Sequence, residues 1–132
     1  MSGRYSRRVI DFANGSVFKL SPADVADVAP SVAPLLVPNE QIVSCFKTVR
    51  DSVVFTDKRL ITINVQGVTG KKRDFTSLPY SRVQAFSIET AGTFDLDAEL
   101  ELWFRGLGKV RLEFRGRANI RQIGQLIAAY VL

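Results

Sequence analysis

The spacing of apolar positions divides the chain into two parts. From residue 40 to residue 115, apolar side chains recur mostly at alternate positions in short runs, the spacing of β-strands, whereas residues 119–131 repeat them every three to four positions. Turn-forming residues separate the short runs. The pattern predicts a mainly β fold with helices: seven antiparallel strands in two packed sheets, closed by a C-terminal α-helix and preceded by an N-terminal helical segment.

The segment RDSVVFTDKRLITINVQGVTGKK, residues 50–72, contains the clearest hairpin. Strands are predicted at 52–56 and 59–65, joined by a tight turn at Asp57 and Lys58, with a loop punctuated by Gly67 and Gly70 after them. Further strands are predicted at 40–50, 72–78 and 83–90. The first of these is apolar on both sides, which indicates burial on two faces or coverage by the helical segment.

The strictest alternation lies in residues 95–104 and 109–115, joined by a loop at residues 106–108. A three-residue loop keeps odd positions opposite odd positions, so the two apolar rows share one face and the charged rows share the other. We expect Trp103 to lie opposite Arg111 and Glu99 opposite Arg115.

An acidic row accompanies these strands, and we interpret it as a solvated face partly neutralised by its neighbour rather than a metal site. It consists of Asp95, Asp97, Glu99 and Glu101.

The first 38 residues are predicted to form an N-terminal arm and helical segment, and residues 39–132 the main domain. Asn14 and Gly15 indicate a short hairpin, although an arm packed on the body or on a neighbouring subunit fits as well. Ser21 is suited to cap a helix. Because proline interrupts helices, two short pieces are expected, at 22–29 and 30–36. At the other end of the chain, Asn119 is the expected N-cap of the closing helix.

Composition excludes several functional classes. With 132 residues, of which 46% are hydrophobic, the chain has the size of one globular domain. No apolar run spans a bilayer and no signal peptide is recognisable, so we expect a cytoplasmic protein. Cys45, the single cysteine, is expected in the core. With no histidine, no phosphate-binding glycine motif and no Cys/His cluster, the chain is predicted to have no enzymatic activity, cofactor or metal.

The formal net charge of +5 is unevenly distributed. Three arginines lie in the first eight residues and a basic run occupies residues 71–73. Nucleic-acid binding is not expected, because the basic residues do not alternate with exposed aromatic residues.

Several runs resemble the soluble bacterial PH-domain family, whose domains have a pleckstrin-homology-like fold. They are LLVPNEQIV at 35–43, the segment at 50–72, PYSRVQAFSIETAGTFDLDAELELWFRG at 79–106, and the closing helix. The resemblance implies a β-barrel of the PH type and a non-enzymatic domain that assembles into ring-like homo-oligomers, pentameric in the family, with no established ligand.

The preferred interpretation is therefore an interaction and assembly module whose protein partner, apart from further copies of itself, is unknown. Candidate contact residues come from the run at 90–95: Thr90, Gly92, Phe94 and Asp95. Phe94 either docks on a neighbouring subunit or enters its own core.

The alternative interpretation is peripheral binding of anionic lipid headgroups through basic loop residues. The connection at residues 50–52 is too short to surround a headgroup. The candidates are therefore Lys58, Arg59, Lys71, Lys72 and Arg73.

Overall fold

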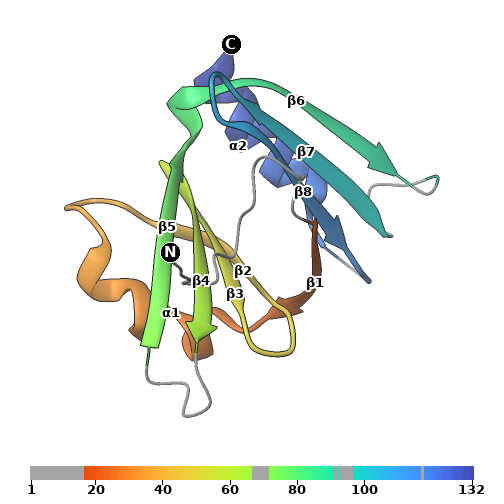
Figure 1. Cartoon of the computed structure of the whole chain (residues 1–132). Helices are drawn as coiled ribbons and strands as arrows, with labels where there is room; N and C mark the ends of the chain where they lie inside the picture. The colour runs from red at the N-terminus through yellow and green to blue at the C-terminus, as the bar shows by residue number, and fades with distance from the viewer. Residues whose placement is uncertain (1–16, 67–71, 91, 93–96, 117) are drawn as a thin grey trace, which may run out of the picture.

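The computed structural model describes residues 17–66, 72–90, 92, 97–116 and 118–132. Its described strands form one eight-stranded sheet in the order β5-β4-β3-β2-β1-β8-β7-β6 (Figure 1). The strands are β1 (Val17–Ala23), β2 (Ile42–Lys47), β3 (Ser52–Thr56), β4 (Arg59–Gln66), β5 (Lys72–Pro79), β6 (Val83–Thr90), β7 (Ala98–Phe104) and β8 (Gly108–Phe114). The mainly β prediction is confirmed, but the strands belong to one curled sheet rather than two separate ones.

Strand β1 is the strand that the sequence analysis missed. It pairs parallel with β8, Leu20 lying beside Phe114, and then antiparallel with β2, Pro22 lying beside Phe46. The prediction of seven antiparallel strands was therefore wrong in number and in one pairing. The cause is tertiary: a short segment ending in Ser-Pro looks like a helix start, but hydrogen bonding to two distant strands holds it extended.

The helix after β1 starts later than predicted. Helix α1 (Val25–Val32) is capped by Asp24, whose carboxylate accepts a hydrogen bond from the Ala26 amide, and Pro30 lies inside it. A 3₁₀ turn, η1 (Ala33–Leu35), follows. The predicted break before Pro30 was wrong, because a proline near a short helix's end loses only one backbone hydrogen bond. The predicted hairpin at Asn14 and Gly15 lies outside the described residues.

The β7–β8 hairpin keeps the predicted faces but not the predicted partners. Its loop comprises residues 105–107, one position earlier than expected, so Trp103 lies opposite Lys109 and Glu101 opposite Arg111. The shift moves each partner by two positions, and the apolar rows therefore still share one face. Burial alternates strictly along β7, with Ala98, Leu100, Leu102 and Phe104 buried.

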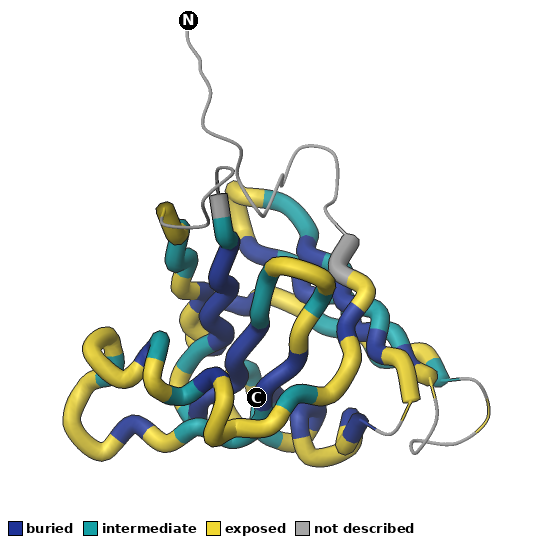
Figure 2. Tube along the Cα trace, turned by 90° about the horizontal axis from the view of Figure 1, so that it is seen from below, coloured by how far each residue is buried: buried dark blue, intermediate teal, exposed yellow. Residues whose placement is uncertain are grey.

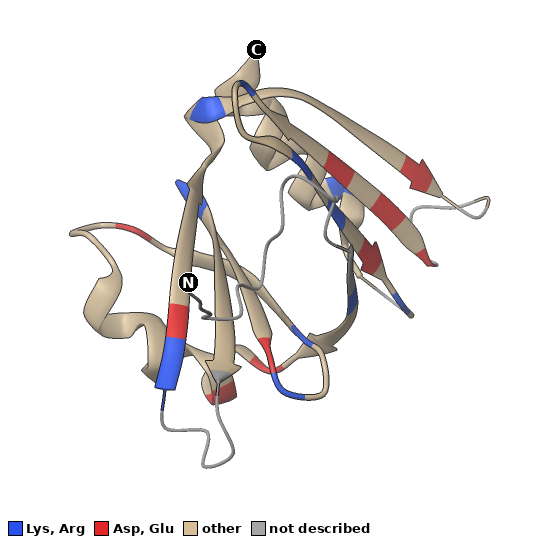
Figure 3. Cartoon of the chain, in the orientation of Figure 1, with Lys and Arg blue, Asp and Glu red and all other residues tan. Residues whose placement is uncertain are grey.

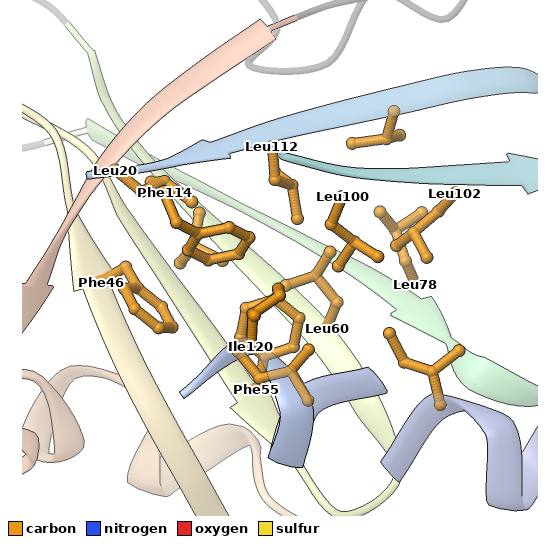
Figure 4. Packing of buried hydrophobic residues seen from close by; sticks show 14 of the residues in the cluster. Leu20, Phe46, Phe55, Leu60, Leu78, Leu100, Leu102, Leu112, Phe114 and Ile120 are labelled. Carbon is orange, nitrogen blue, oxygen red and sulfur yellow. The ribbon is translucent and has the colours of Figure 1, made fainter. Parts of the chain in front are cut away.

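Two hydrophobic clusters lie on opposite faces of the sheet. The larger fills the concave inner face, where Phe46, Phe55 and Phe114 meet edge to face or tilted (Figure 4). Helix α2 (Ile120–Val131) closes this cluster with its predicted apolar stripe, and Asn119 caps it as expected. The smaller cluster lies between α1 and the outer face of β2–β5 and contains the buried Cys45.

Buried residues lie mainly along the strands, while exposed ones dominate the turns and short helices around them (Figure 2). The short 3₁₀ turn η2 (Tyr80–Arg82) links the two ends of the sheet, β5 and β6. The two edges diverge from this corner (Figure 1).

Candidate interaction surface

The basic residues singled out in the sequence do not form one site. Lys58 and Arg59 lie at the start of β4, whereas Lys72 and Arg73 pair with the end of that strand. Seven residue steps of a strand separate the two ends by about 23 Å. Lys71 lies outside the described residues.

Arg59 forms an ion pair with Glu40 of the same chain. Its guanidinium donates to both carboxylate oxygens of Glu40, at 2.9 Å and 3.0 Å, and also to the Leu35 carbonyl and the Ser77 hydroxyl. The Glu40 side chain is fully buried. This pair fastens the segment before β2 to the hairpin of β3 and β4, and sequence reasoning gave no sign of it because the partners are 19 residues apart.

Burial alone would raise the pKa of Glu40. Hydrogen bonds from Arg59, from the Thr56 hydroxyl and from the Val37 amide outweigh that effect, so the pKa of Glu40 lies below its ordinary value. Glu40 is therefore a buried carboxylate held ionised, and Arg59 is its counter-ion rather than an open contact for a ligand.

Lys72 and Arg73 lie near the turn between β2 and β3. Asp51 in that turn accepts hydrogen bonds from the Asn64 amide group and the Val65 amide, and Val65 pairs with Arg73. At the tip of the turn Val49 is fully exposed, at 101% of its reference area. This end of the sheet thus combines basic side chains with one apolar side chain in water.

The candidate assembly residues lie at the end of β6. Thr90 is half-buried and ends the strand, and Gly92 is exposed with a φ of +116°, a conformation that favours glycine. Phe94 and Asp95 lie outside the described residues, so their predicted contacts remain predictions.

The sheet has two open edges, and they differ in character. Within the described residues β5 and β6 each pair with only one strand. The β5 edge begins with Lys72 and Arg73 and ends at Pro79, features that discourage pairing with a further strand. The β6 edge carries no lysine, arginine or proline in its eight residues. Its backbone is therefore the less protected of the two.

The outer face of β6, β7 and β8 carries interleaved charges (Figure 3). Arg111 contacts Glu99 at 2.9 Å and Glu113 at 3.7 Å, and Lys109 contacts Glu101 at 3.1 Å. Arg111 donates a hydrogen bond to the Glu99 carboxylate, and this bond raises the pKa of the guanidinium above its ordinary value. Lys109, rather than the expected Arg111, lies over the ring of Trp103, 5.9 Å from its centre. The expected partial neutralisation of the acidic row is seen for Glu99 and Glu101.

A hollow of about 470 Å³ lies on this face at the end of β6. Four carboxylates line it together with one arginine: Glu89, Asp97, Glu99, Glu113 and Arg115. Glu89 lies directly opposite Glu99 on the neighbouring strand, and it is exposed at the sheet edge. Arg111 also pairs with two of these carboxylates, Glu99 and Glu113, so four carboxylates face two arginines and the hollow keeps an excess of negative charge beside the less protected edge.

The chemistry of the remaining groups is limited. Burial raises the pKa of the Cys45 thiol to about 11, so it is protonated at neutral pH and a poor nucleophile.

In the described part of the chain no group of three or more acidic, histidine or cysteine residues is arranged to hold a metal ion. None of the described helices is both long and apolar enough to cross a membrane.

Comparison with known proteins gives consistent matches. The sequence pattern of the family described as Bacterial PH domain matches residues 11–131. The uncharacterized protein YjqA of Bacillus subtilis is 43% identical over 120 residues, covering 89% of this chain and 96% of its own length. YozO, an uncharacterized protein of the same organism, is 31% identical over 103 residues, covering 78% of this chain and 89% of its own.

Two solved structures share the fold. A protein of the DUF1696 family with a pleckstrin-homology domain, from Shewanella loihica, has a TM-score of 0.71 at 39% identity and covers 87% of this chain and 99% of its own. A pleckstrin-homology domain from Shewanella amazonensis has a TM-score of 0.59 at 44% identity, covering 85% and 91%. These matches confirm the predicted PH-like fold and the predicted family.

Proposed function

Starting from the fact that this chain belongs to the bacterial PH-domain family, we propose that it is a non-enzymatic assembly module that forms a cyclic homo-oligomer. The observation that supports the proposal best is the open edge of β6. A strand edge without lysine, arginine or proline offers a row of unpaired backbone groups to a further strand.

Cyclic assembly needs two different surfaces on each copy. The sheet offers two different edges, β5 and β6, which diverge from the corner at η2. A contact between unlike surfaces that repeats by rotation closes into a ring. The family resemblance sets five as the expected number of copies.

Light scattering coupled to size exclusion tests the proposal. We expect the protein at micromolar concentration to have a mass several times that of the 14.7 kDa chain, with native mass spectrometry giving the number of copies. The double variant Ala85→Lys/Ser87→Lys places two lysines on exposed positions of the β6 edge and is expected to lower the mass.

A matched control places the same two charges elsewhere. Gln125→Lys/Ala129→Lys changes two exposed positions of α2, and this variant is expected to keep the mass of the unmodified protein. A wild-type protein that is monomeric at these concentrations would overturn the proposal. Equal loss of assembly in both double variants would show that added charge, not the β6 edge, is responsible.

A second candidate function is binding to membranes that contain anionic lipids. The observation in its favour is that the fully exposed Val49 lies in the β2–β3 turn, at the same end of the sheet as Lys72 and Arg73, because apolar and basic side chains at one end of a domain suit a charged bilayer interface. Co-sedimentation with phosphatidylcholine vesicles, with and without phosphatidylserine, measures it. Binding that needs phosphatidylserine and is lost in Lys72→Ala/Arg73→Ala, but not in Lys58→Ala at the opposite end of β4, would support it. Absence of binding would reject it.

A further inference from the structure

We propose that the N-terminal segment, residues 1–16, binds to the inner face of β4 and β5 of its own chain, with one of its arginines beside Asn64 and Asp74. The segment then acts as an internal ligand that occupies this part of the inner face. Three features support the proposal: buried polar atoms without a partner, a carboxylate beside them, and the composition and reach of the segment.

The inner face of β4 changes from apolar to polar along the strand. Leu60 belongs to the large hydrophobic cluster, whereas the next two inward positions are Thr62 and Asn64. Thr62 pairs with Val53, a member of the same cluster, which places these alternate positions of β4 on the inner face. Both polar side chains are buried, with exposures of 0% for Thr62 and 1% for Asn64.

Two atoms of these side chains have no hydrogen-bond partner among the described residues. They are the hydroxyl oxygen of Thr62 and the Oδ1 atom of Asn64. The amide nitrogen of the Asn64 side chain donates to Asp51 at 2.9 Å, which leaves Oδ1 as an acceptor. Buried polar atoms without partners are destabilising. The pair therefore points to a donor that reaches the inner face at this position.

The described helices do not offer such a donor. Helix α1 packs on the outer face of β2–β5, and α2 turns its apolar stripe towards the inner face near η2 and β6 (Figure 1). The inward side chains of β8 are apolar as well, namely Val110, Leu112 and Phe114. This leaves a segment outside the described elements as the source of the donor.

A carboxylate lies beside the two atoms on the neighbouring strand. Asp74 of β5 pairs with Asn64 and is half-buried. None of the ion pairs among the described residues includes Asp74 or the exposed Lys72, which lies two positions away on the same face. A buried acceptor, a hydroxyl and a carboxylate on one face match a guanidinium, which carries five donors and a positive charge. The site therefore favours arginine.

The N-terminal segment has the composition and the reach to supply it. Three of its first eight residues are arginines, and its only acidic residue is Asp11. Strand β1 begins at Val17, and Arg8 lies nine positions earlier, which gives a reach of up to about 30 Å. In the sheet, three strand spacings separate β1 from β4, about 14 Å. The segment is therefore long enough to reach this site within its own chain.

The acidic hollow beside β6 offers the same segment less. Its carboxylates Glu99 and Glu113 are already paired with Arg111. Next to it, the buried atom without a partner in the described part of the chain is Nε of Arg111, which is a donor and gains nothing from a second cation. Charge alone favours the hollow, whereas the unpartnered buried acceptor favours the inner face of β4 and β5.

Limited cleavage by trypsin tests whether the segment is bound. Trypsin cuts after arginine and needs a chain that is free to enter its active site. We expect cleavage after Arg7 and Arg8 in the folded full-length protein to be about tenfold slower than in a synthetic peptide of residues 1–16, because charge-assisted hydrogen bonds hold the segment. Mass spectrometry at early times gives both rates.

Two variants test the site. Asp74→Asn removes the negative charge and Thr62→Val removes the hydroxyl, and we expect each to speed cleavage of the segment severalfold. If the Thr62 hydroxyl had no partner, Thr62→Val would leave the cleavage rate unchanged. Asp27→Asn, the same charge change at an exposed position of α1, is the matched control and is expected to keep the wild-type rate.

Disulfide trapping tests which chain the segment binds. The double variant Val9→Cys/Thr76→Cys keeps the arginines and Asp74, and we expect it to cross-link within one chain under mild oxidation. Val9→Cys/Ser77→Cys is the control, because Ser77 is adjacent in sequence but lies on the outer face, where it accepts from Arg59. The native Cys45 is buried and does not compete.

The outcomes decide the inference without reference to assembly. Slow cleavage in wild type, faster cleavage in both site variants and a selective cross-link within one chain support it. Cleavage as fast as in the free peptide overturns it, and so does slow cleavage that either site variant leaves unchanged. Faster cleavage in Glu89→Gln would then assign the segment to the acidic hollow. A cross-link that joins two chains, or equal cross-linking in the control, also overturns it. A monomeric protein would overturn only the assembly proposed above.

Discussion

Glu40 and Arg59 form a two-pronged ion pair in which both carboxylate oxygens accept from one guanidinium, at 2.9 Å and 3.0 Å. Glu40 is buried and Arg59 retains only 19% of its side-chain exposure. The pair joins the chain before β2 to the start of β4, and the Leu35 carbonyl and the Ser77 hydroxyl extend the network.

Removing one partner of this ion pair should lower the free energy of unfolding. In Arg59→Ala the buried carboxylate of Glu40 loses its counter-ion, and we expect the free energy of unfolding to fall by about 3–5 kcal/mol, less if Glu40 takes up a proton. Urea unfolding at neutral pH measures it. Arg82→Ala, an exposed arginine in η2, is the control and should change stability by less than about 0.5 kcal/mol. A loss equally small in both variants would contradict a stabilising role for the pair.

The same pair should make stability depend on acidity. Because the pKa of Glu40 is lowered on folding, its contribution is complete above the unfolded-state pKa of about 4.3 and disappears as the pH falls through the lower folded-state pKa. We expect Glu40→Gln to be less stable than wild type at neutral pH and to lose less stability on acidification. Urea midpoints of wild type and of Glu40→Gln, measured from pH 7 down to pH 3, give the stability of each protein as a function of pH. Parallel curves would contradict this assignment.

Cys45 should respond to alkali in the opposite sense. Burial raises the pKa of its thiol to about 11 in the folded protein, so its contribution is complete below the unfolded-state pKa of about 8.5 and is lost as the pH rises towards 11. We expect Cys45→Ala to lose less stability over that range than wild type. The native thiol should react with a disulfide reagent far more slowly than the thiol in urea-unfolded protein. Equal rates would contradict its burial.

Gly124 should resist substitution. A methyl group at this position would lie 2.6 Å from the Cδ1 atom of Ile88, where α2 crosses β6. Since that atom ends a flexible side chain, Gly124→Ala is expected to cost about 1 kcal/mol, towards the lower end for overpacking. Adding Ile88→Val removes the clashing atom, and we expect the double variant to recover part of the loss. Additive losses in a thermal unfolding cycle would contradict this contact.

Local spacing was enough to locate most of the sheet. The predicted hairpin at 52–56 and 59–65 and the strand at 83–90 agree with β3, β4 and β6 to within one residue. The alternating burial of β7 and the apolar stripe of α2 also follow the pattern. These features depend on neighbours two to four positions apart, which a sequence displays directly.

The arrangement of residues on the candidate surface was much harder to predict from the sequence than the strands were. The basic residues singled out there lie at both ends of β4, because an antiparallel hairpin places the first residues of one strand beside the last residues of the other. The ion pair between Arg59 and Glu40 could not be predicted from neighbouring residues either, since several acidic residues were equally available partners. The Glu89 carboxylate was overlooked because its importance comes from being at a sheet edge.

The sequence alone determined the mainly β class, the closing helix and the position of most strands, because periodicity and turn chemistry are local properties, and the resemblance of several runs indicated the family. Only the tertiary structure decided that β1 joins β2 to β8, that the strands form a single sheet, and that β5 and β6 are its open edges. Strand order depends on hydrogen bonds between segments far apart in the chain. Those bonds also decide which charged side chains meet, and therefore which surfaces are left for another molecule.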